Sequence, residues 1–284
     1  MLNIMRATFL SILFFLSCHL QANEYQTQFS IQYGKLDASS NESEFYSLSA
    51  SHYLNPIKLG DHPYNLATFY SRQQNVKISA SAWKSESKDF YTENITSASV
   101  AYSYSAKNNP FKWGIGTSIS DYESEFFSTT SKSDTKSIFT NAGYYFTPSS
   151  LVNIAYQYSE TDASSVDTTS EAAILSAQHV VKNIGGSALA FYASINRSRT
   201  KREAGVFYNP FSYSLTSEYY LSRKSNIFAR IGWTAGSLNE SGFYYLGASH
   251  FLSKNKVITT TYSAPFDDRG SNVWILEIKG ESRF

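Results

Sequence analysis

The 284-residue chain has one cysteine, six prolines and few charges: 17% of its residues are Asp, Glu, Lys or Arg, whereas ordinary soluble domains have ~25%. A single cysteine excludes a disulfide scaffold and a multi-cysteine zinc site. The 24 Lys and Arg are balanced by 23 Asp and Glu, so the cationic surface of a nucleic-acid-binding protein is missing. After residue 16 no apolar run approaches the ~18 residues of a membrane-spanning helix. We therefore expect no metal, no cofactor and no nucleic-acid partner.

Aromatic residues, in contrast, are abundant. The chain has 22 Tyr, 20 Phe and 4 Trp, and the tyrosines are spread over its whole length, often two residues apart. Globular cores favour Leu, Ile and Val over Tyr, whose ring is apolar and whose hydroxyl prefers water. The composition therefore indicates a protein with a large interfacial surface.

The first 22 residues read as a secretory signal peptide. Arg6 supplies the positive charge, Ala7 to Leu16 forms a ten-residue apolar run, and Ala22 provides a small residue before the cleavage point. A membrane anchor would need about twice that apolar length. A lipoprotein would use Cys18, but the three residues before it fit the acylation pattern poorly. The mature domain is then 23–284, with 23 basic and 23 acidic residues and no cysteine.

The mature chain alternates apolar and polar residues with a period of two, which is typical of strands with two unlike faces. In 151–159 the apolar phase is Val152, Ile154, Tyr156 and Tyr158, and in 111–120 it is Phe111, Trp113, Ile115, Thr117 and Ile119. The opposite phase holds Ser, Gly, Ala, Asn and Gln. No segment shows a sustained helical period.

Two kinds of connection separate these segments, and together they predict the topology. Six are compact and carry Pro, Asn, Gly or Lys: 55–63, 107–110, 147–150, 182–186, 222–225 and 253–256. Seven are polar and mostly longer: 35–42, 85–93, 123–134, 160–170, 197–205, 237–241 and 266–271. They close seven hairpins, which predicts an all-β, transmembrane, antiparallel up-and-down barrel of about 14 strands with short periplasmic turns and longer extracellular loops.

A soluble β-sandwich is the rival fold. A sandwich would bury Val, Leu and Ile on the apolar face of each strand. Here the apolar face is rich in Tyr near strand ends while the other face is small and polar, which suits lipid outside and water inside. In lipid an unpaired strand edge is not tolerated, so the sheet must close on itself.

The last strand, Ser271 to Phe284, resembles the C-terminal signature of Gram-negative outer-membrane barrels. Trp274, Leu276, Ile278 and Phe284 share one phase, and the chain ends on the aromatic residue. The resemblance implies that Phe284 is the membrane-assembly signal read by the outer-membrane assembly machinery. Gly280 and Ser282 depart from the apolar residues usual at those positions.

Two further segments resemble the general porin family of Gram-negative bacterial outer membranes. Glu44–Pro56 ends in aromatic-x-x-Pro, and His62–Val76, which we expect to be the third strand, contains Pro-x-x-x-Ala-x-Phe. The resemblance implies a passive diffusion channel for small hydrophilic solutes and ions, with no catalytic residues. The expected partners are outer-membrane lipid and lipopolysaccharide, the assembly machinery and the permeating solutes.

An enzymatic barrel would need a base beside a nucleophile on one strand face. His52 follows Ser51 and His250 follows Ser249, but adjacent residues on a strand point to opposite sides. We therefore expect no catalytic residues and assign His52, His179 and His250 to the girdle or the rim of the barrel.

The lumen is where functional charges are expected. The turn 222–225 should bring Glu218 and Arg230 into near register on the inner face, either as a pair that filters solutes by charge or as a local ion pair without influence on flux. Glu277, Lys279 and Lys112 are further inward-facing charges. The sequence thus favours an outer-membrane porin, and the alternative is a barrel without a pore that serves as a surface adhesin or structural protein.

Overall fold

The computed structural model describes residues 24–37, 41–60, 62–87, 91–127, 129–163, 167–182, 187–202, 205–236, 241–266 and 273–284. The expected signal peptide, 1–22, lies outside them.

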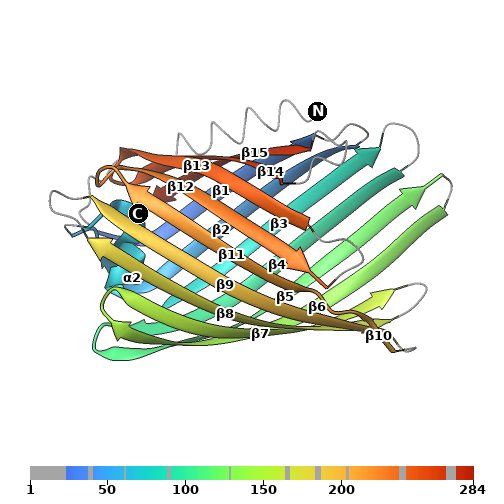
Figure 1. The fold of residues 1–284 in the computed structure, drawn as a ribbon, viewed down its shortest axis with the longest axis horizontal. Helices are drawn as coiled ribbons and strands as arrows, with labels where there is room; N and C mark the ends of the chain where they lie inside the picture. Colours follow the sequence, from blue (N-terminus) through green and yellow to red (C-terminus); the bar gives the residue numbers. More distant parts are fainter. Residues whose placement is uncertain are drawn as a thin grey trace.

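Fifteen antiparallel strands form one sheet, in which the four-residue β10 pairs only with β9 and the other fourteen close a barrel (Figure 1). The strands are β1 (Glu24–Asp37), β2 (Asn41–Lys58), β3 (Asn75–Ser87), β4 (Tyr91–Ala106), β5 (Asn109–Phe126), β6 (Thr129–Thr147), β7 (Ser150–Ala163), β8 (Thr168–Lys182), β9 (Ala188–Arg202), β10 (Gly205–Tyr208), β11 (Phe211–Tyr220), β12 (Ser225–Ala235), β13 (Ser241–Ser253), β14 (Lys256–Pro265) and β15 (Trp274–Arg283). The predicted fold class and strand number are confirmed.

The register of the sheet fixes the width of the barrel. β1 pairs with β15, and β8 pairs with β9, so no edge of the barrel is left open. Directly opposed residues, followed once around the wall from Ala188 on β9, return to β9 at Arg202, which lies 14 residues further along. Fourteen strands with this stagger tilt by ~36° and enclose a backbone cylinder roughly 26 Å across. Such a barrel is wider than its own side chains fill.

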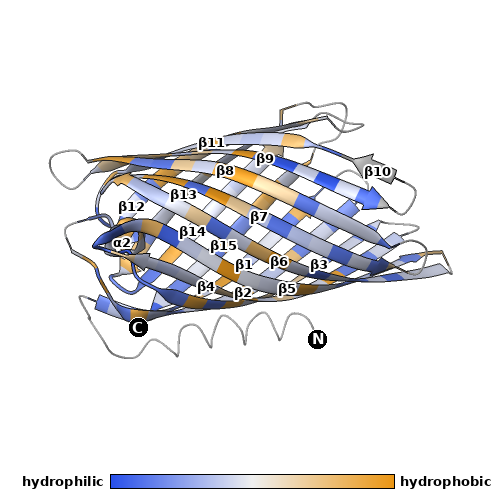
Figure 2. Ribbon diagram, turned by 90° about the horizontal axis from the view of Figure 1, so that it is seen from below, coloured by the Kyte–Doolittle hydropathy of each residue, from blue (hydrophilic) through white to orange (hydrophobic). Residues whose placement is uncertain are grey.

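The two faces of the wall follow the predicted phase. On β5, Trp113, Ile115 and Ile119 are exposed on the outside, while the alternating Gly114 and Gly116 are buried on the inside. The same alternation runs around the barrel as bands of apolar and polar residues (Figure 2). Within the described ranges, no helix is long and apolar enough to span a membrane.

Several of the polar segments expected as longer loops continue the strands in their described residues, whereas 237–240 and 267–272 lie outside the described ranges. Residues 123–126 belong to the end of β5 and 129–134 to the start of β6, where Glu123 lies opposite Lys132 with their charged groups 2.9 Å apart. Although this segment is polar and rich in serine and threonine, its backbone amides and carbonyls pair across the two strands, and threonine favours the extended conformation. The expectation of a long loop at this position is therefore wrong.

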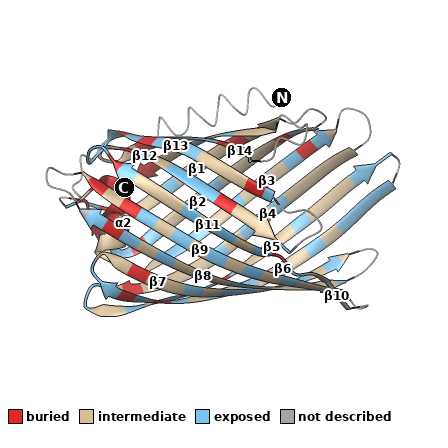
Figure 3. Cartoon of the chain, in the orientation of Figure 1, coloured by how far each residue is buried: buried red, intermediate tan, exposed pale blue. Residues whose placement is uncertain are grey.

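The segment expected as the third strand is also different. Tyr64–Leu66 forms a 3₁₀ turn, η1, and Ala67–Ser71 a short helix, α2; β3 begins only at Asn75. Pro63 precedes the first turn, and Arg72, with φ of 48°, ends the helix in the left-handed region. The helix lies at the end of the barrel that also holds the C-terminus (Figure 1), and the buried residues gather mostly toward that end (Figure 3).

Ile115→Lys should impair folding into lipid bilayers much more than Ser118→Lys. Ile115 faces outward and is 48% exposed, so a lysine there meets lipid at a cost of ~2–4 kcal/mol near the midplane, while Ser118 faces the lumen. The measurement is the folded fraction by heat-dependent electrophoretic mobility after refolding into vesicles. Equal losses for the two variants would show that the strand has the opposite phase.

The orientation of the barrel can be tested by thiol labelling. We expect Ser131→Cys, at the tip of β6, to react with an impermeant thiol reagent on whole cells, and Lys107→Cys, in the short β4–β5 turn, to react only after the cells are opened. Both positions are exposed in the structure. The reverse pattern would invert the assigned topology.

Candidate functional site: the lumen and its plug

The connection between β2 and β3, described at residues 59–60 and 62–74, folds back into the barrel end as a plug. Tyr64, Leu66 and Ala67 are at most 5% exposed. On one side the plug joins an apolar cluster formed by Tyr25, Tyr53, Ile57, Leu59, Tyr64, Ala67, Phe251 and Val257. On the other side Leu66 packs against Val180, Ala188, Ala190 and Tyr220, beside Phe69, Tyr70 and Tyr192. The plug therefore reaches walls on both sides of the lumen.

Three arginines fasten the plug to the wall through its backbone and rings. Arg223 donates to the Gly60 carbonyl, and the Arg223 carbonyl accepts from the Tyr64 amide at 3.0 Å. Arg283 Nη1 donates to the Tyr64 carbonyl at 3.0 Å. Arg72 reaches outward from the plug to the Thr147 carbonyl, 3.3 Å, and lies 3.7 Å above the Tyr145 ring. These contacts satisfy backbone amides and carbonyls of the plug that do not pair within the sheet.

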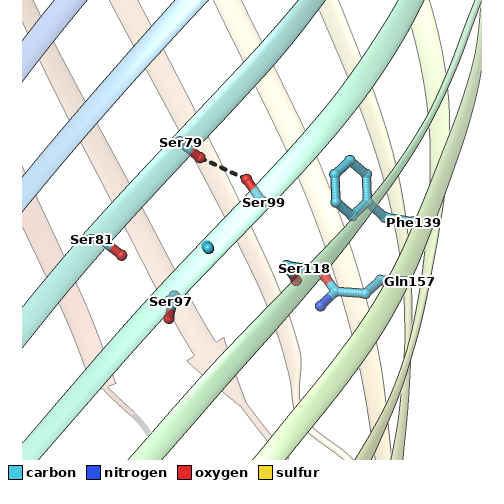
Figure 4. A pocket seen from close by; sticks show the side chains of 8 residues that line it. Ser79, Ser81, Ser97, Ser99, Ser118, Phe139 and Gln157 are labelled. Carbon is cyan, nitrogen blue, oxygen red and sulfur yellow. Dashed lines mark hydrogen bonds between the residues drawn. The ribbon is translucent and has the colours of Figure 1, made fainter.

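Farther from the plug end, serine and threonine hydroxyls line the inner wall from β1 to β9. One row of directly opposed residues is hydroxylic on nine successive strands: Ser30, Ser49, Ser79, Ser99, Ser118, Ser137, Ser159, Ser170 and Thr200. Some neighbours in the row bond each other: the hydroxyl oxygens are 2.7 Å apart in Ser30–Ser49, 2.6 Å in Ser79–Ser99, and 3.0 Å in both Ser137–Ser159 and Ser170–Thr200. A concavity of about 270 Å³ lies on this wall, bordered by Phe139 and Gln157 (Figure 4).

Inward aromatic rings lie against the wall over glycines. The ring of Phe139 covers Gly116, and that of Phe228 covers Gly247, so closely that no Cβ would fit beneath either ring. Each pair stands at opposed positions on neighbouring strands. The glycines let the rings lie flat against the wall, so the rings take up less of the space inside the barrel.

A cavity of about 330 Å³ lies next to the plug and is lined by four charged residues, which we call the charged floor: Glu218, Lys279, Glu281 and Arg283. Glu281 accepts from Gln28 Nε2 at 2.5 Å and pairs with Lys279 at 2.6 Å and Arg283 at 3.6 Å. Glu218, on the same cavity, accepts from the Tyr192 hydroxyl at 3.3 Å and from the Asn226 amide. Asn226 in turn accepts from Asn65 of the plug at 3.1 Å. The floor thus connects lumen charges with the plug.

Glu218 and Arg230 both face inward but do not pair. Glu218 stands opposite Phe228 and Arg230 opposite Thr216, an offset of two residues. Arg230 donates to Ser214 Oγ at 3.3 Å and lies 5.8 Å from the Phe243 ring and 5.7 Å from the Tyr245 ring. Among the residues the structure describes, the expected inner-wall ion pair between them is not formed.

The other predicted residues occupy separate places. Glu277 accepts from Gln32 Nε2 at 3.2 Å, and Lys279 belongs to the charged floor. Lys112 lies on the inner wall opposite Ser105 and Gly143, with no ion pair in the described part of the chain. Phe284 closes the barrel seam: its amide donates to the Thr27 carbonyl at 2.7 Å and its ring lies 6.0 Å from that of Phe29.

The sequence reading missed the plug and the arginines that hold it. A signal was present, because Tyr64, Leu66, Ala67, Phe69 and Tyr70 break the strand alternation. Arg223 and Arg283 carried no signal of their own, since a basic residue at a strand end is usually solvated.

The rim histidines bond hydroxyls on neighbouring strands. The distances from Nδ1 to the hydroxyl oxygen are 3.1 Å for His52 and Thr27, 2.9 Å for His179 and Ser150, and 2.8 Å for His250 and Ser225. No carboxylate bonds these imidazoles among the described residues. A hydrogen bond repeated on three separate strand pairs indicates support of the rim rather than one catalytic centre.

Comparisons with known proteins agree on the fold. No protein-family model matches the chain, and no curated protein matches its sequence. Solved structures do: the Acinetobacter baumannii outer membrane protein Omp33, at 15% identity and TM-score 0.55, covers 92% of this chain and 99% of its own. The CymD monoaromatic hydrocarbon channel, at 11% and 0.63, covers 92% and 89%, and the Ralstonia pickettii toluene transporter TbuX, at 9% and 0.60, covers 92% and 90%. The fold is that of the Gram-negative outer-membrane barrels, which with the apolar outer face indicates an outer-membrane location; membership of the general porin family is not confirmed.

Replacing residues 65–71 by a glycine-serine linker of equal length should raise single-channel conductance severalfold. The change removes Leu66, Ala67 and Phe69, which pack against the inner wall at this end of the barrel, and so widens the opening there. The measurement is ion current through the refolded protein in planar bilayers. As a control, Phe127→Gly at the opposite hairpin tips should leave the current unchanged. An unaltered conductance in the linker variant, with a folded barrel, would place the constriction elsewhere.

Proposed function

We propose that this protein is a passive outer-membrane channel for small hydrophilic solutes and ions, whose periplasmic exit is narrowed by the plug. The observation that carries the proposal is the hydroxyl row on nine strands of the lumen wall. Serine and threonine exchange hydrogen bonds with passing water and solutes, and the neutral row admits either sign of charge.

A hydrocarbon channel is the second candidate, because CymD and TbuX are named as hydrocarbon channels or transporters. One observation favours it: Phe45, Trp83, Ile95 and Tyr122 occupy opposed inward positions on four neighbouring strands near the hairpin tips. Below this patch, however, the next rows toward the plug on these strands are serine. An apolar solute would leave the patch for a wall of hydroxyls, which is unfavourable. The hydrophilic route is therefore preferred.

CymD and TbuX are named as a channel and a transporter, and the three Ser/Thr–His pairs lack an acid partner among the described residues, so the proposal includes no enzymatic step. A surface adhesin would bind through its hairpin tips. At these tips the described surface is mainly polar and charged, as in the Lys35–Glu42 pair at 3.3 Å and the Lys132–Glu123 pair at 2.9 Å, although Phe126 and Phe127 are exposed.

The test is permeation by the refolded protein. We expect discrete conductance steps in potassium chloride, and swelling of proteoliposomes in neutral polyols and sugars at rates that fall with solute size. Toluene added to saturation should leave the ion current unchanged, whereas occupation of a hydrocarbon path would reduce it. Absence of current and swelling in both the wild type and the plug-linker variant would refute the channel.

A further inference from the structure

Glu218 is a carboxylate without a counter-ion at the foot of the lumen. It lies on β11, is partly buried, and accepts from the Tyr192 hydroxyl at 3.3 Å and from the Asn226 amide. Tyr220, 2% exposed, interacts with the same carboxylate. Glu218 forms no ion pair with any residue the structure describes. Glu281, on the same cavity, has two cations within 4 Å.

An incompletely solvated carboxylate without a cation is unfavourable unless something else supplies the positive charge. The cavity of about 330 Å³ that Glu218 borders provides room for a small group to do so. Lysine and arginine on that cavity do not fill this role, because Lys279 and Arg283 both bind Glu281.

The neighbours of Glu218 suit an organic cation. An ammonium group has three donors and a guanidinium five, and neither accepts a hydrogen bond. Tyr192 and Tyr220 contact the carboxylate through their hydroxyl groups and line the same cavity, so their phenolic oxygens can accept further hydrogen bonds from such a cation. The hydroxyl and amide donors already present hold the carboxylate in place without neutralising it.

We propose that Glu218, Tyr192 and Tyr220 form a binding site for the ammonium or guanidinium group of a permeating solute. The inference rests on the proposed channel function and names one class of solute that the lumen selects. The site borders the exit route, because Asn65 and Thr68 of the plug line the same cavity. Asn226 bonds both Glu218 and Asn65, so a solute cation on Glu218 competes with the bond that leads to the plug.

The experiment measures block of the potassium current by ethanolammonium in planar bilayers containing the full mature protein, with ethylene glycol as the neutral analogue of similar size. We expect ethanolammonium to reduce the current at concentrations where ethylene glycol has no effect. Glu218→Gln keeps the shape and removes the charge, so the blocking concentration should rise at least about tenfold, since a hydrogen bond to a charged partner is lost.

The matched control is Glu93→Gln. Glu93 is also a lumen carboxylate that accepts from a tyrosine, Tyr122, at 2.7 Å, but it lies near the hairpin tips, far along β4 from the plug. This variant should retain the block. Tyr192→Phe, which keeps the ring, should weaken the block less than Glu218→Gln and serves if the glutamine variant does not fold.

The outcomes separate the two proposals. Potassium current without ethanolammonium block, or equal block in wild type and Glu218→Gln, overturns the cation site and leaves the channel intact. Loss of block in Glu93→Gln to the same extent as in Glu218→Gln also overturns the site, because it would show a general effect of lumen charge. Absence of potassium current in wild type and plug-linker variant contradicts the channel itself.

Discussion

The structure depends on the requirement that every backbone amide and carbonyl inside a membrane find a partner within the protein. Fourteen strands meet it by pairing β1 with β15 and β8 with β9, which leaves no open barrel edge. Closure with a stagger of 14 residues has a geometric result. Opposed residues do not form level rings; each inner row winds around the wall as it climbs, so the hydroxyl row passes from Ser30, midway along β1, to Thr200, near the far end of β9.

The plug provides the buried apolar contacts that a hydrophobic core provides in a soluble domain. Both apolar clusters of buried residues found in the described chain contain plug residues, one through Tyr64 and Ala67 and the other through Leu66. The rest of the wall is one sheet thick, with apolar side chains outside and mostly small or polar side chains inside. Burial of apolar surface therefore contributes to stability mainly at the plug end of the barrel, while the opposite half depends on strand pairing and on its lipid contacts.

Much of this architecture could be predicted from the sequence, and the reason is periodicity. In segments such as 111–120 the apolar residues belong to the outer face of the strand and the small or polar residues to the inner face. Strand phase and fold class therefore follow from a local pattern. The plug could not be predicted in the same way, because η1 and α2 together span only eight residues and their burial depends on β8, β9, β11 and β13, far away in the chain. For the candidate site, the inward phase of Glu218 followed from alternation. The offset from Arg230 depended on pairing to the residue, and local patterns do not fix it.

The contact between Arg283 and the Tyr64 carbonyl joins residues 219 positions apart, at the two ends of the barrel sequence. Arg283 is the last residue of β15 and adjoins Phe284, whose backbone completes the seam with β1. The hydrogen bond from Arg283 to the plug therefore exists only in the closed barrel, in which β15 is paired with β1. The same two C-terminal residues thus serve two contacts, the Phe284 seam with β1 and the Arg283 bond to the plug, so a chain truncated before them lacks both.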